Sequence, residues 1–382
     1  MAKVKALWNH LMPFATDSSG VCSLFCDADA VVIGMDPGAT AVRCYPFTER
    51  RKDKRARYKG IHIGEIDAAM GKLDESVDRL KLLIDDEETG QIVLVGTPVA
   101  SLIGVDLKAL SRRLEKESGR RVMGFSTTGN RYYDEGLSDA YRVIYDRIRK
   151  EESPGAASEE RKKEESLQDR EEYRTVSLLG FDTLDYPDEM ERQRILEHIE
   201  ENQMRIGSIW GFRSGVSEWE RALQADLNVV CSASALRLAE RMEKDRGIPF
   251  VLLDDLLEKT GGLGIVASGL RIPKDMERIL IIGEQITSSA LRKHIRSCCR
   301  EAEGREPEIV SAGFFLEHKK LMEGKDVKLK SEEDLITLLS RNHFDLVIGD
   351  PMFRLLTDHD QNFFMRIHPP VSGGFADQFM SS

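Results

Sequence analysis

The chain has 382 residues, of which 41% are hydrophobic and 32% are charged, and its formal net charge is -11. This length and composition predict about two or three soluble globular domains. The acidic balance argues against general binding of nucleic acid, because that binding depends on lysine and arginine side chains that neutralise phosphates. One segment is an exception: residues 49–59, ERRKDKRARYK, are strongly basic. This segment is either a solvated surface loop or a docking patch for an acidic partner.

The chain shows no sign of membrane insertion or export. No apolar run approaches the length of a membrane span, and the opening MAKVKALWNHLMPF lacks the apolar core and cleavage site of a signal peptide. We therefore expect a cytoplasmic protein whose cysteines are reduced. The spacing of the cysteines contains no pair typical of a structural zinc site. The six are Cys22, Cys26, Cys44, Cys231, Cys298 and Cys299.

The first part of the chain, residues 1–152, alternates strand and helix patterns. Apolar runs predict strands at residues 30–35, 92–95 and 121–125. Helical spacing of apolar residues predicts helices at residues 73–83, 107–117 and 133–150. Asp106 stands where its side chain could cap the second of these helices. Residues 153–174 begin with Ser-Pro-Gly and are dense in charge, so this segment is predicted to be a linker.

The same alternation continues in residues 175–273 and 274–382. In the middle part we expect strands at residues 175–182, 206–210, 228–231 and 250–253, and helices at residues 188–203, 217–225 and 235–244. Ser217 is the expected N-cap of the second of these helices. In the last part we expect strands at residues 279–284, 308–310 and 344–349, with helices ending near residues 303 and 341. The first of these last helices carries Cys298 and Cys299, of which at least one is expected in the core.

Repeated strand–helix–strand units with apolar strands predict parallel sheets that are covered by helices on both faces. The fold class is therefore α/β, with several doubly wound domains. In such folds ligands bind beyond the carboxyl ends of the strands. Cys231, the turn at residues 96–106 and the turn at residues 283–287 all follow strand ends.

Three of these stretches could carry chemistry, and each also has a purely structural interpretation. Cys231 is either a small core residue or a metal ligand. His368, in RIHPPVSGGF, is either a surface histidine or an imidazole presented to a cavity. Backbone N–H groups of the turn at residues 96–106 could hold an anion or a sulfide-rich cluster, but the turn lacks the Gly-Lys-Ser/Thr ending of a phosphate loop. No GxSxG or HExxH motif is present.

Five segments, taken in chain order, resemble the nitrogenase component 1 family. They are MPFATDSSGVCSLF, IHIGEIDAAMGKLDESV, IVLVGTPVASLIGVDLKAL, LNVVCSASALRLAERMEKDRGIPF and FDLVIGD. Together they extend from residue 12 to residue 350. The resemblance implies three doubly wound Rossmann-like domains with mostly parallel sheets around a central cavity. We place these domains at residues 1–152, 175–273 and 274–382.

The resemblance also implies site residues. Cys231 matches the thiolate ligand of the family's active-site cofactor, and His368 lies near the region that supplies a histidine. The implied cofactor contacts are Cys231, His368 and Thr97, and the implied metal ligands are Cys231, Cys26 and Cys44. Two departures matter: Pro98 and Ala39 stand where the family has cluster thiolates. Because neither side chain can ligate iron, the usual subunit-bridging cluster is put in doubt.

The function implied by the resemblance is that of an oxidoreductase subunit. Such a subunit takes low-potential electrons from an ATP-dependent iron–sulfur reductase and reduces a small or tetrapyrrole-like substrate. Its cofactor would be an iron–sulfur cluster or a related metallocofactor, and its partner a sister subunit or a second copy of the chain. Two alternatives stay open: a non-catalytic partner subunit or metallocofactor-assembly scaffold, favoured by the missing thiolates, and an α/β module that binds a metal complex.

Overall fold

The computed structural model describes most of the chain. The described residues are 9–28, 30–36, 57–62, 70, 74–85, 91–102, 104–151, 174–212, 214–273, 276–304 and 306–373. Cys44, Ala39 and nearly all of the segment at residues 153–174 lie outside these ranges.

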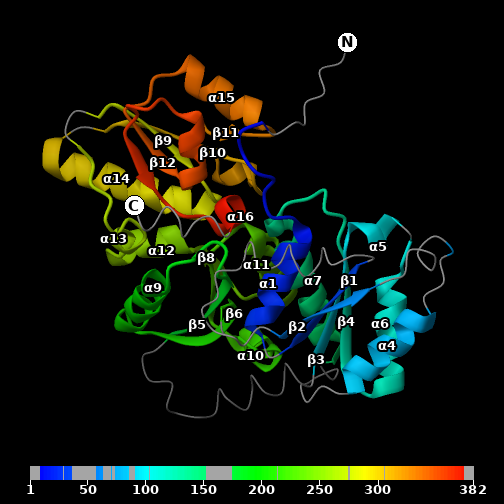
Figure 1. Cartoon of the computed structure of the whole chain (residues 1–382). Coiled ribbons are helices and arrows are strands. Elements are labelled where there is room, and N and C mark those ends of the chain that lie inside the picture. The colour runs from blue at the N-terminus through cyan, green and yellow to red at the C-terminus, as the bar shows by residue number, and fades with distance from the viewer. Residues whose placement is uncertain are drawn as a thin grey trace, which may run out of the picture.

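Three parallel sheets form the framework (Figure 1). The N-terminal sheet has the order β2 (Arg57–His62), β1 (Val31–Asp36), β3 (Gln91–Gly96), β4 (Arg121–Ser126). The middle sheet has the order β6 (Met204–Gly211), β5 (Arg174–Phe181), β7 (Leu227–Val230), β8 (Phe250–Leu252). The C-terminal sheet has the order β11 (Val327–Lys328), β10 (Glu308–Gly313), β9 (Arg278–Ile282), β12 (Leu346–Gly349), β13 (Phe363–Met365). The prediction of an α/β fold with mostly parallel sheets is thus confirmed.

Helices connect the strands. Those of the N-terminal part are α1 (Asp17–Asp27), α4 (Asp74–Asp85), α5 (Pro98–Leu102), α6 (Leu107–Ser118) and α7 (Tyr133–Glu151). The middle part has α9 (Glu189–Glu201), α10 (Val216–Arg221), η1 (Ala222–Gln224), η2 (Ala233–Ala235), α11 (Leu236–Arg246), α12 (Leu253–Thr260) and α13 (Leu263–Val266). The C-terminal part has α14 (Gln285–Glu303), η3 (Lys319–Leu321), α15 (Glu332–Arg341), η4 (Pro351–Leu356) and α16 (Pro369–Ser372). Among the described helices, none has both the length and the apolar composition to cross a membrane.

Each sheet reverses its order once, and this reversal locates the places where ligands bind in doubly wound folds. In the middle sheet the chain starts at β5 and then adds strands on both sides, so the reversal lies between β5 and β7. In the C-terminal sheet it lies between β9 and β12. In Figure 1 the yellow and orange C-terminal sheet lies above the other two sheets, and red α16 reaches the region where all three parts meet.

Local signals explain several boundaries. Asp106 caps α6 as expected, since its side chain accepts a hydrogen bond of 2.9 Å from the N–H of Ala109. Cys299 is buried on α14, as expected for one member of the pair. The expectation for Ser217 is wrong, because α10 begins at Val216 and Gly215 is its N-cap. A glycine there reaches the extended N-cap conformation without a side-chain cap.

The basic segment at residues 49–59 is only partly described. Its last residues, Arg57 to Lys59, belong to β2 at the edge of the N-terminal sheet. The prediction of a surface loop is therefore wrong for these three residues, because pairing with β1 fixes them as a strand. The rest of the segment lies outside the described residues.

Candidate functional site

Residues that follow the carboxyl ends of β5, β7 and β9 lie where the three parts of the chain meet. We call this region the junction; it comprises Tyr133, Asp185, Cys231, Glu284 and His368. Asp185 and Cys231 follow β5 and β7 of the middle sheet, and Glu284 follows β9 of the C-terminal sheet. His368 precedes α16, and Tyr133 is the first residue of α7. The junction thus lies at the order reversals of two sheets, where doubly wound folds place their ligands.

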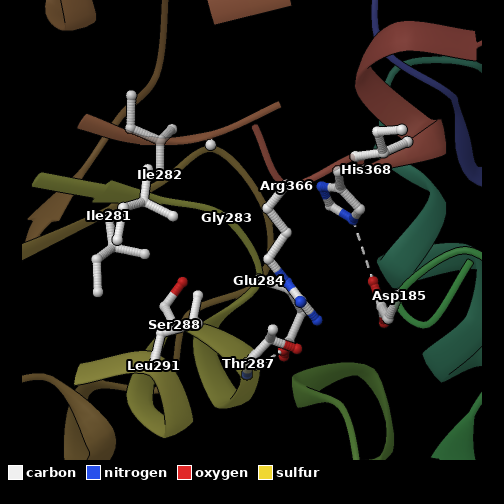
Figure 2. Close-up of a pocket in the computed structure, with 13 residues that line it drawn as sticks. Asp185, Ile281, Ile282, Gly283, Glu284, Thr287, Ser288, Leu291, Arg366 and His368 are labelled. Carbon is white, nitrogen blue, oxygen red and sulfur yellow. Dashed lines mark hydrogen bonds and ion pairs between the residues drawn. The ribbon is translucent and has the colours of Figure 1, made fainter. Parts of the chain in front are cut away.

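A buried hydrogen-bonded triad joins the three parts at the junction. The Tyr133 hydroxyl donates to Asp185 Oδ1, and His368 Nε2 lies 3.2 Å from the same oxygen and 2.9 Å from the hydroxyl. Figure 2 shows the contact between His368 and Asp185. The Asp185 side chain is fully buried. Burial and the charge of Asp185 raise the pKa of Tyr133 well above its ordinary value, so this hydroxyl stays protonated.

These contacts determine how the imidazole of His368 is presented. Both oxygens near Nε2 can accept a hydrogen bond, so a ring N–H is assigned to Nε2. The backbone N–H of His368 donates to Asp350 Oδ2 at 2.7 Å and fixes the position of the residue. In Figure 2 the other ring nitrogen, Nδ1, points away from Asp185, toward the side where Arg366 is drawn. An imidazole held by a carboxylate in this way can accept a hydrogen bond or coordinate a metal through its second nitrogen.

Glu284 links the C-terminal sheet to the middle sheet. Its Oε2 caps α14 by accepting from the N–H of Thr287 at 2.8 Å, and its Oε1 accepts from the N–H of Ala233 at 2.8 Å. Burial, with a contribution from the charge of Asp185, raises the pKa of Glu284 to about 7. The junction therefore holds a carboxyl group that titrates near neutral pH.

Cys231 lies deeper than the triad. Its side chain is fully buried in the hydrophobic core, and its Sγ lies 3.6 Å from the Val229 carbonyl oxygen. Its own carbonyl accepts a 2.6 Å hydrogen bond from the Tyr186 hydroxyl. Burial raises the pKa of the thiol well above its ordinary value, and the nearby carboxyl groups of Asp182 and Glu284 add to this effect. The thiol is therefore neutral at physiological pH.

The open space at the junction is small. A cavity of about 20 Å³ lies between the β9 and β12 ends. Its polar lining comprises Asp185, Glu284, Thr287, Ser288, Arg366 and His368 (Figure 2). One oxygen of Asp185, Oδ2, is buried and has no hydrogen-bond partner in the described part of the chain. A space of this size accommodates one water molecule, which could donate a hydrogen bond to that oxygen.

The remaining space is filled by polar contacts between the parts. Arg366 makes a bidentate ion pair with Glu191 of α9, at 2.8 and 3.3 Å, and also donates to the Val266 carbonyl. Asp134 Oδ2 accepts from the N–H of Leu316, which connects α7 to the C-terminal part. These bonds close the junction with the chain's own groups.

The groups at the junction do not fit an iron–sulfur cluster held by thiolates. Such a cluster needs deprotonated cysteines facing a cavity. The Cys231 side chain is enclosed by the hydrophobic core, and none of the cysteines that the structure describes lines the cavity. The cavity lining carries two carboxyl groups, an imidazole and two hydroxyls, which are harder donors than sulfur, together with the cationic guanidinium of Arg366. Moreover, the described residues contain no group of three or more His, Cys, Asp or Glu arranged to hold a metal ion.

The structure brings together only two of the residues that the sequence singled out. Cys231 and His368 both lie at the junction. Thr97 lies instead at the end of β3, where its N–H donates to the Met35 carbonyl, and it does not line the cavity. Cys26 is buried on α1 in the core. Cys44 lies outside the described residues, so its expected role as a ligand stays a prediction.

Sequence reasoning missed Tyr133 and Asp185; it placed the turn at residues 283–287 at a ligand-binding strand end but did not single out Glu284 within it. Each stands just beyond a strand or at the first residue of a helix, but the three belong to different parts of the chain. The available signal was weak: the dipeptide GE after β9 contains Glu284, but the acidic residue of FD after β5 is Asp182 and not Asp185. Only the fold reveals that these strand ends converge.

Comparisons with known proteins agree with this architecture. A family model described as "Nitrogenase component 1 type Oxidoreductase" matches residues 44–258. A solved structure described as "Nitrogenase Cp1 at pH 6.5" is similar, with a TM-score of 0.66 and 14% identity; the match covers 100% of this chain and 94% of that one. For "Nitrogenase Cp1 at pH 5" the TM-score is 0.65 and the identity 14%, with 93% and 83% covered. These two similarities concern the fold alone. The search of curated proteins found no match.

Proposed function

Since the chain belongs to the nitrogenase component 1 type oxidoreductase family, we propose that it is a partner subunit of a component 1-like assembly that carries no thiolate-held cluster at its own junction. One observation supports this most directly: the junction is filled by the chain's own hydrogen bonds and ion pairs. The triad, the Arg366–Glu191 pair and the Glu284 bridge leave a cavity of about 20 Å³. The junction then serves to hold the three parts in one arrangement.

The partner in this proposal is a sister subunit or a second copy of the chain. The chain's own residues bind and orient: Glu284 and Asp185 hold backbone and side-chain donors of neighbouring parts, and His368 is fixed between them. Any low-potential electron chemistry, with its ATP-dependent reductase, would then be carried out by the sister subunit.

A second candidate is the redox subunit that the sequence favours, which would reduce a small or tetrapyrrole-like substrate. The orientation of His368 supports it, because Asp185 fixes Nε2 and leaves Nδ1 facing the cavity side, as in a metal-ligating histidine. This candidate requires the junction to open, since one water molecule nearly fills the present cavity.

Iron and acid-labile sulfide, measured per chain after anaerobic purification of the full-length protein, separate the two candidates. The variants are Cys231→Ala and, as a matched buried thiol away from the junction, Cys299→Ala. We expect no iron above background in any of the three proteins. Several irons in the wild type that Cys231→Ala loses and Cys299→Ala keeps would overturn the proposal and establish the redox subunit.

The assembly itself is tested by sedimentation. The chain has a mass of 43.2 kDa. A species of at least twice this mass, formed by the purified chain or with a co-expressed sister subunit, is expected. A strictly monomeric chain under both conditions would contradict the role of a partner subunit.

A further inference from the structure

Cys298 differs from the other cysteines of the described chain. Cys22, Cys26, Cys231 and Cys299 are buried, whereas Cys298 is partly exposed on α14. Solvent access is the first requirement for a thiol that reacts with a dissolved reagent. Among the cysteines that the structure describes, Cys298 is thus the one that meets this requirement.

A histidine lies directly beside this thiol. His294 precedes Cys298 by one helical turn, and its Nε2 lies 3.5 Å from Cys298 Sγ. The helix α13 packs against α14 at this level, and a Cβ atom on Gly264 would lie 3.7 Å from His294 Cε1. The imidazole is therefore backed by another element on one side and held near the thiol on the other.

The protonation state of His294 suits it to accept a proton. Burial lowers the pKa of the imidazole, and the opposing effect of the Glu301 charge is smaller. The ring is therefore neutral near pH 7 and has one nitrogen with an accepting lone pair. A thiol beside a neutral imidazole matches the nucleophile–base pairs that activate cysteines.

We propose that Cys298, activated by His294, is a thiol-modification site that reacts with small-molecule disulfides. In the reaction the thiol proton moves to His294 Nε2, and the thiolate attacks one sulfur of the disulfide. The disulfide S–S bond breaks as a new S–S bond to Cys298 forms. The departing thiolate takes up the proton, so Cys298 is oxidised and half of the reagent is reduced.

This site is independent of the junction. Cys298 lies 14 residues beyond Glu284 along the same helix sequence, which corresponds to about 20 Å at 1.5 Å per residue. The inference therefore goes beyond the proposed function, and its failure would leave that function untouched.

The test is the rate of mixed-disulfide formation with glutathione disulfide at pH 7.5, followed by intact mass and by peptide mapping of the full-length protein. We expect one rapid addition, mapped to the peptide that contains Cys298 and absent in Cys298→Ser. His294→Gln should slow this addition about tenfold, since the variant lacks the nitrogen that accepts the thiol proton during the attack. His343→Gln is the matched control: it makes the same substitution at a highly exposed histidine whose side chain contacts the Asp345 carboxylate and not a thiol.

Two outcomes would overturn the proposal. One is an unchanged rate of Cys298 modification in His294→Gln. The other is rapid modification that maps to a different cysteine and persists in Cys298→Ser. Because both substitutions lie at a partly exposed surface, near-UV circular dichroism should match the wild type and establish that each variant is folded.

Discussion

The buried Glu284 is expected to make the protein less stable as the pH rises toward neutrality. Its pKa is raised from 4.5 to about 7 in the folded chain. Between these values the folded state keeps the proton while the unfolded state releases it. The free energy of unfolding therefore falls as the pH rises through this range, by at most about 3 kcal/mol from this group.

Replacement of Glu284 by glutamine tests this dependence. Glu284→Gln cannot ionise, so we expect the loss of stability between pH 5 and pH 8 to be smaller than in the wild type. Part of the loss should remain, because burial also raises the pKa of Asp134 to about 6 and that of Glu317 to about 7. Urea unfolding at both pH values measures the difference. Equal pH dependence in Glu284→Gln and in the surface control Glu197→Gln would contradict the assignment.

The Tyr133 hydroxyl donates one of the two hydrogen bonds that Asp185 Oδ1 accepts from the described residues. In Tyr133→Phe the Asp185 carboxyl loses one of its two partners on Oδ1, while Oδ2 already has none. We expect a loss of about 1.5–3 kcal/mol, the range for a buried hydrogen bond to a charged group. Thermal and urea unfolding provide the measurement. Tyr132→Phe, at the half-buried neighbouring position, should change stability by less than about 0.5 kcal/mol. Equal effects of the two substitutions would argue against a specific role for the triad.

At the scale of elements, the crossing of α1 and α7 depends on two glycines. A Cβ atom on Gly20 would overlap the Tyr133 carbonyl, and one on Gly136 would overlap the backbone of Asp17. The two helices approach so closely that only hydrogen fits at these positions. Because α7 begins at the junction, this contact also sets the position of Tyr133.

Gly136→Ala should therefore be strongly destabilising. The overlap is with backbone atoms, which cannot rotate away, so the helices must separate at a cost of about 3 kcal/mol or more. Gly215→Ala is the control, since its nearest contact would be Ser217 Oγ at 3.9 Å, and exchanging glycine for alanine at an N-cap costs no more than about 1 kcal/mol. Chemical denaturation of both variants tests the expectation. Similar midpoints for the two proteins would rule out the close crossing.

The elements that the sequence predicted well are those with a clear period. The helices α6, α7 and α15 and the buried strands β3, β7 and β12 appear close to their expected positions. In contrast, α1 was missed because its sequence, DSSGVCSLFCD, is buried on most of its surface and lacks an amphipathic pattern. β2 was missed because its charged composition at the sheet edge resembles a loop.

The candidate site was only half accessible to the same reasoning. Cys231 and His368 stood out by residue type and position, and they do lie at one junction. Asp185 and Glu284 acquire their meaning from contacts 183 and 51 residues away along the chain. No local pattern encodes such pairings.

At the scale of the whole molecule, the first residues that the structure describes, from Asn9 on, contact the C-terminal part. The N–H groups of Asn9, His10 and Leu11 all donate to the Glu332 carboxylate, at 3.2, 3.0 and 2.7 Å. Farther along, the N–H of Ala15 donates to the Pro370 carbonyl at 2.8 Å, directly beside the junction. One continuous core cluster also includes residues of all three sheets, so we expect the three parts to unfold together.

Glu332 therefore acts as an anchor for the N-terminal segment, and its pH dependence is opposite to that of Glu284. Burial raises the pKa of Glu332, but the three N–H donors outweigh this effect and leave it below 4.5. The stabilisation is thus complete above pH 4.5 and is lost as the pH falls through the folded-state value. The contribution of Glu332 is lost as the pH falls below 4.5, and that of Glu284 is lost as the pH rises toward 7. The free energy of unfolding is therefore expected to be greatest on the acidic side of neutrality.

Glu332→Gln separates the two effects. A neutral amide keeps the shape of the side chain but weakens three charge-assisted hydrogen bonds. We therefore expect the free energy of unfolding at pH 7 to be about 1–2 kcal/mol lower than in the wild type. Because the amide has no carboxylate to protonate, residue 332 should add little further loss when the variant is taken to pH 4. Hydrogen exchange should show faster exchange confined to residues 9–15, while the amides of β9 and β12 keep their protection. Glu201→Gln, at an exposed position on α9, serves as the control. If residues 9–15 exchange at the wild-type rate in Glu332→Gln, the segment is held by the packing of Phe14 against Phe314 and Phe353 instead of by the carboxylate.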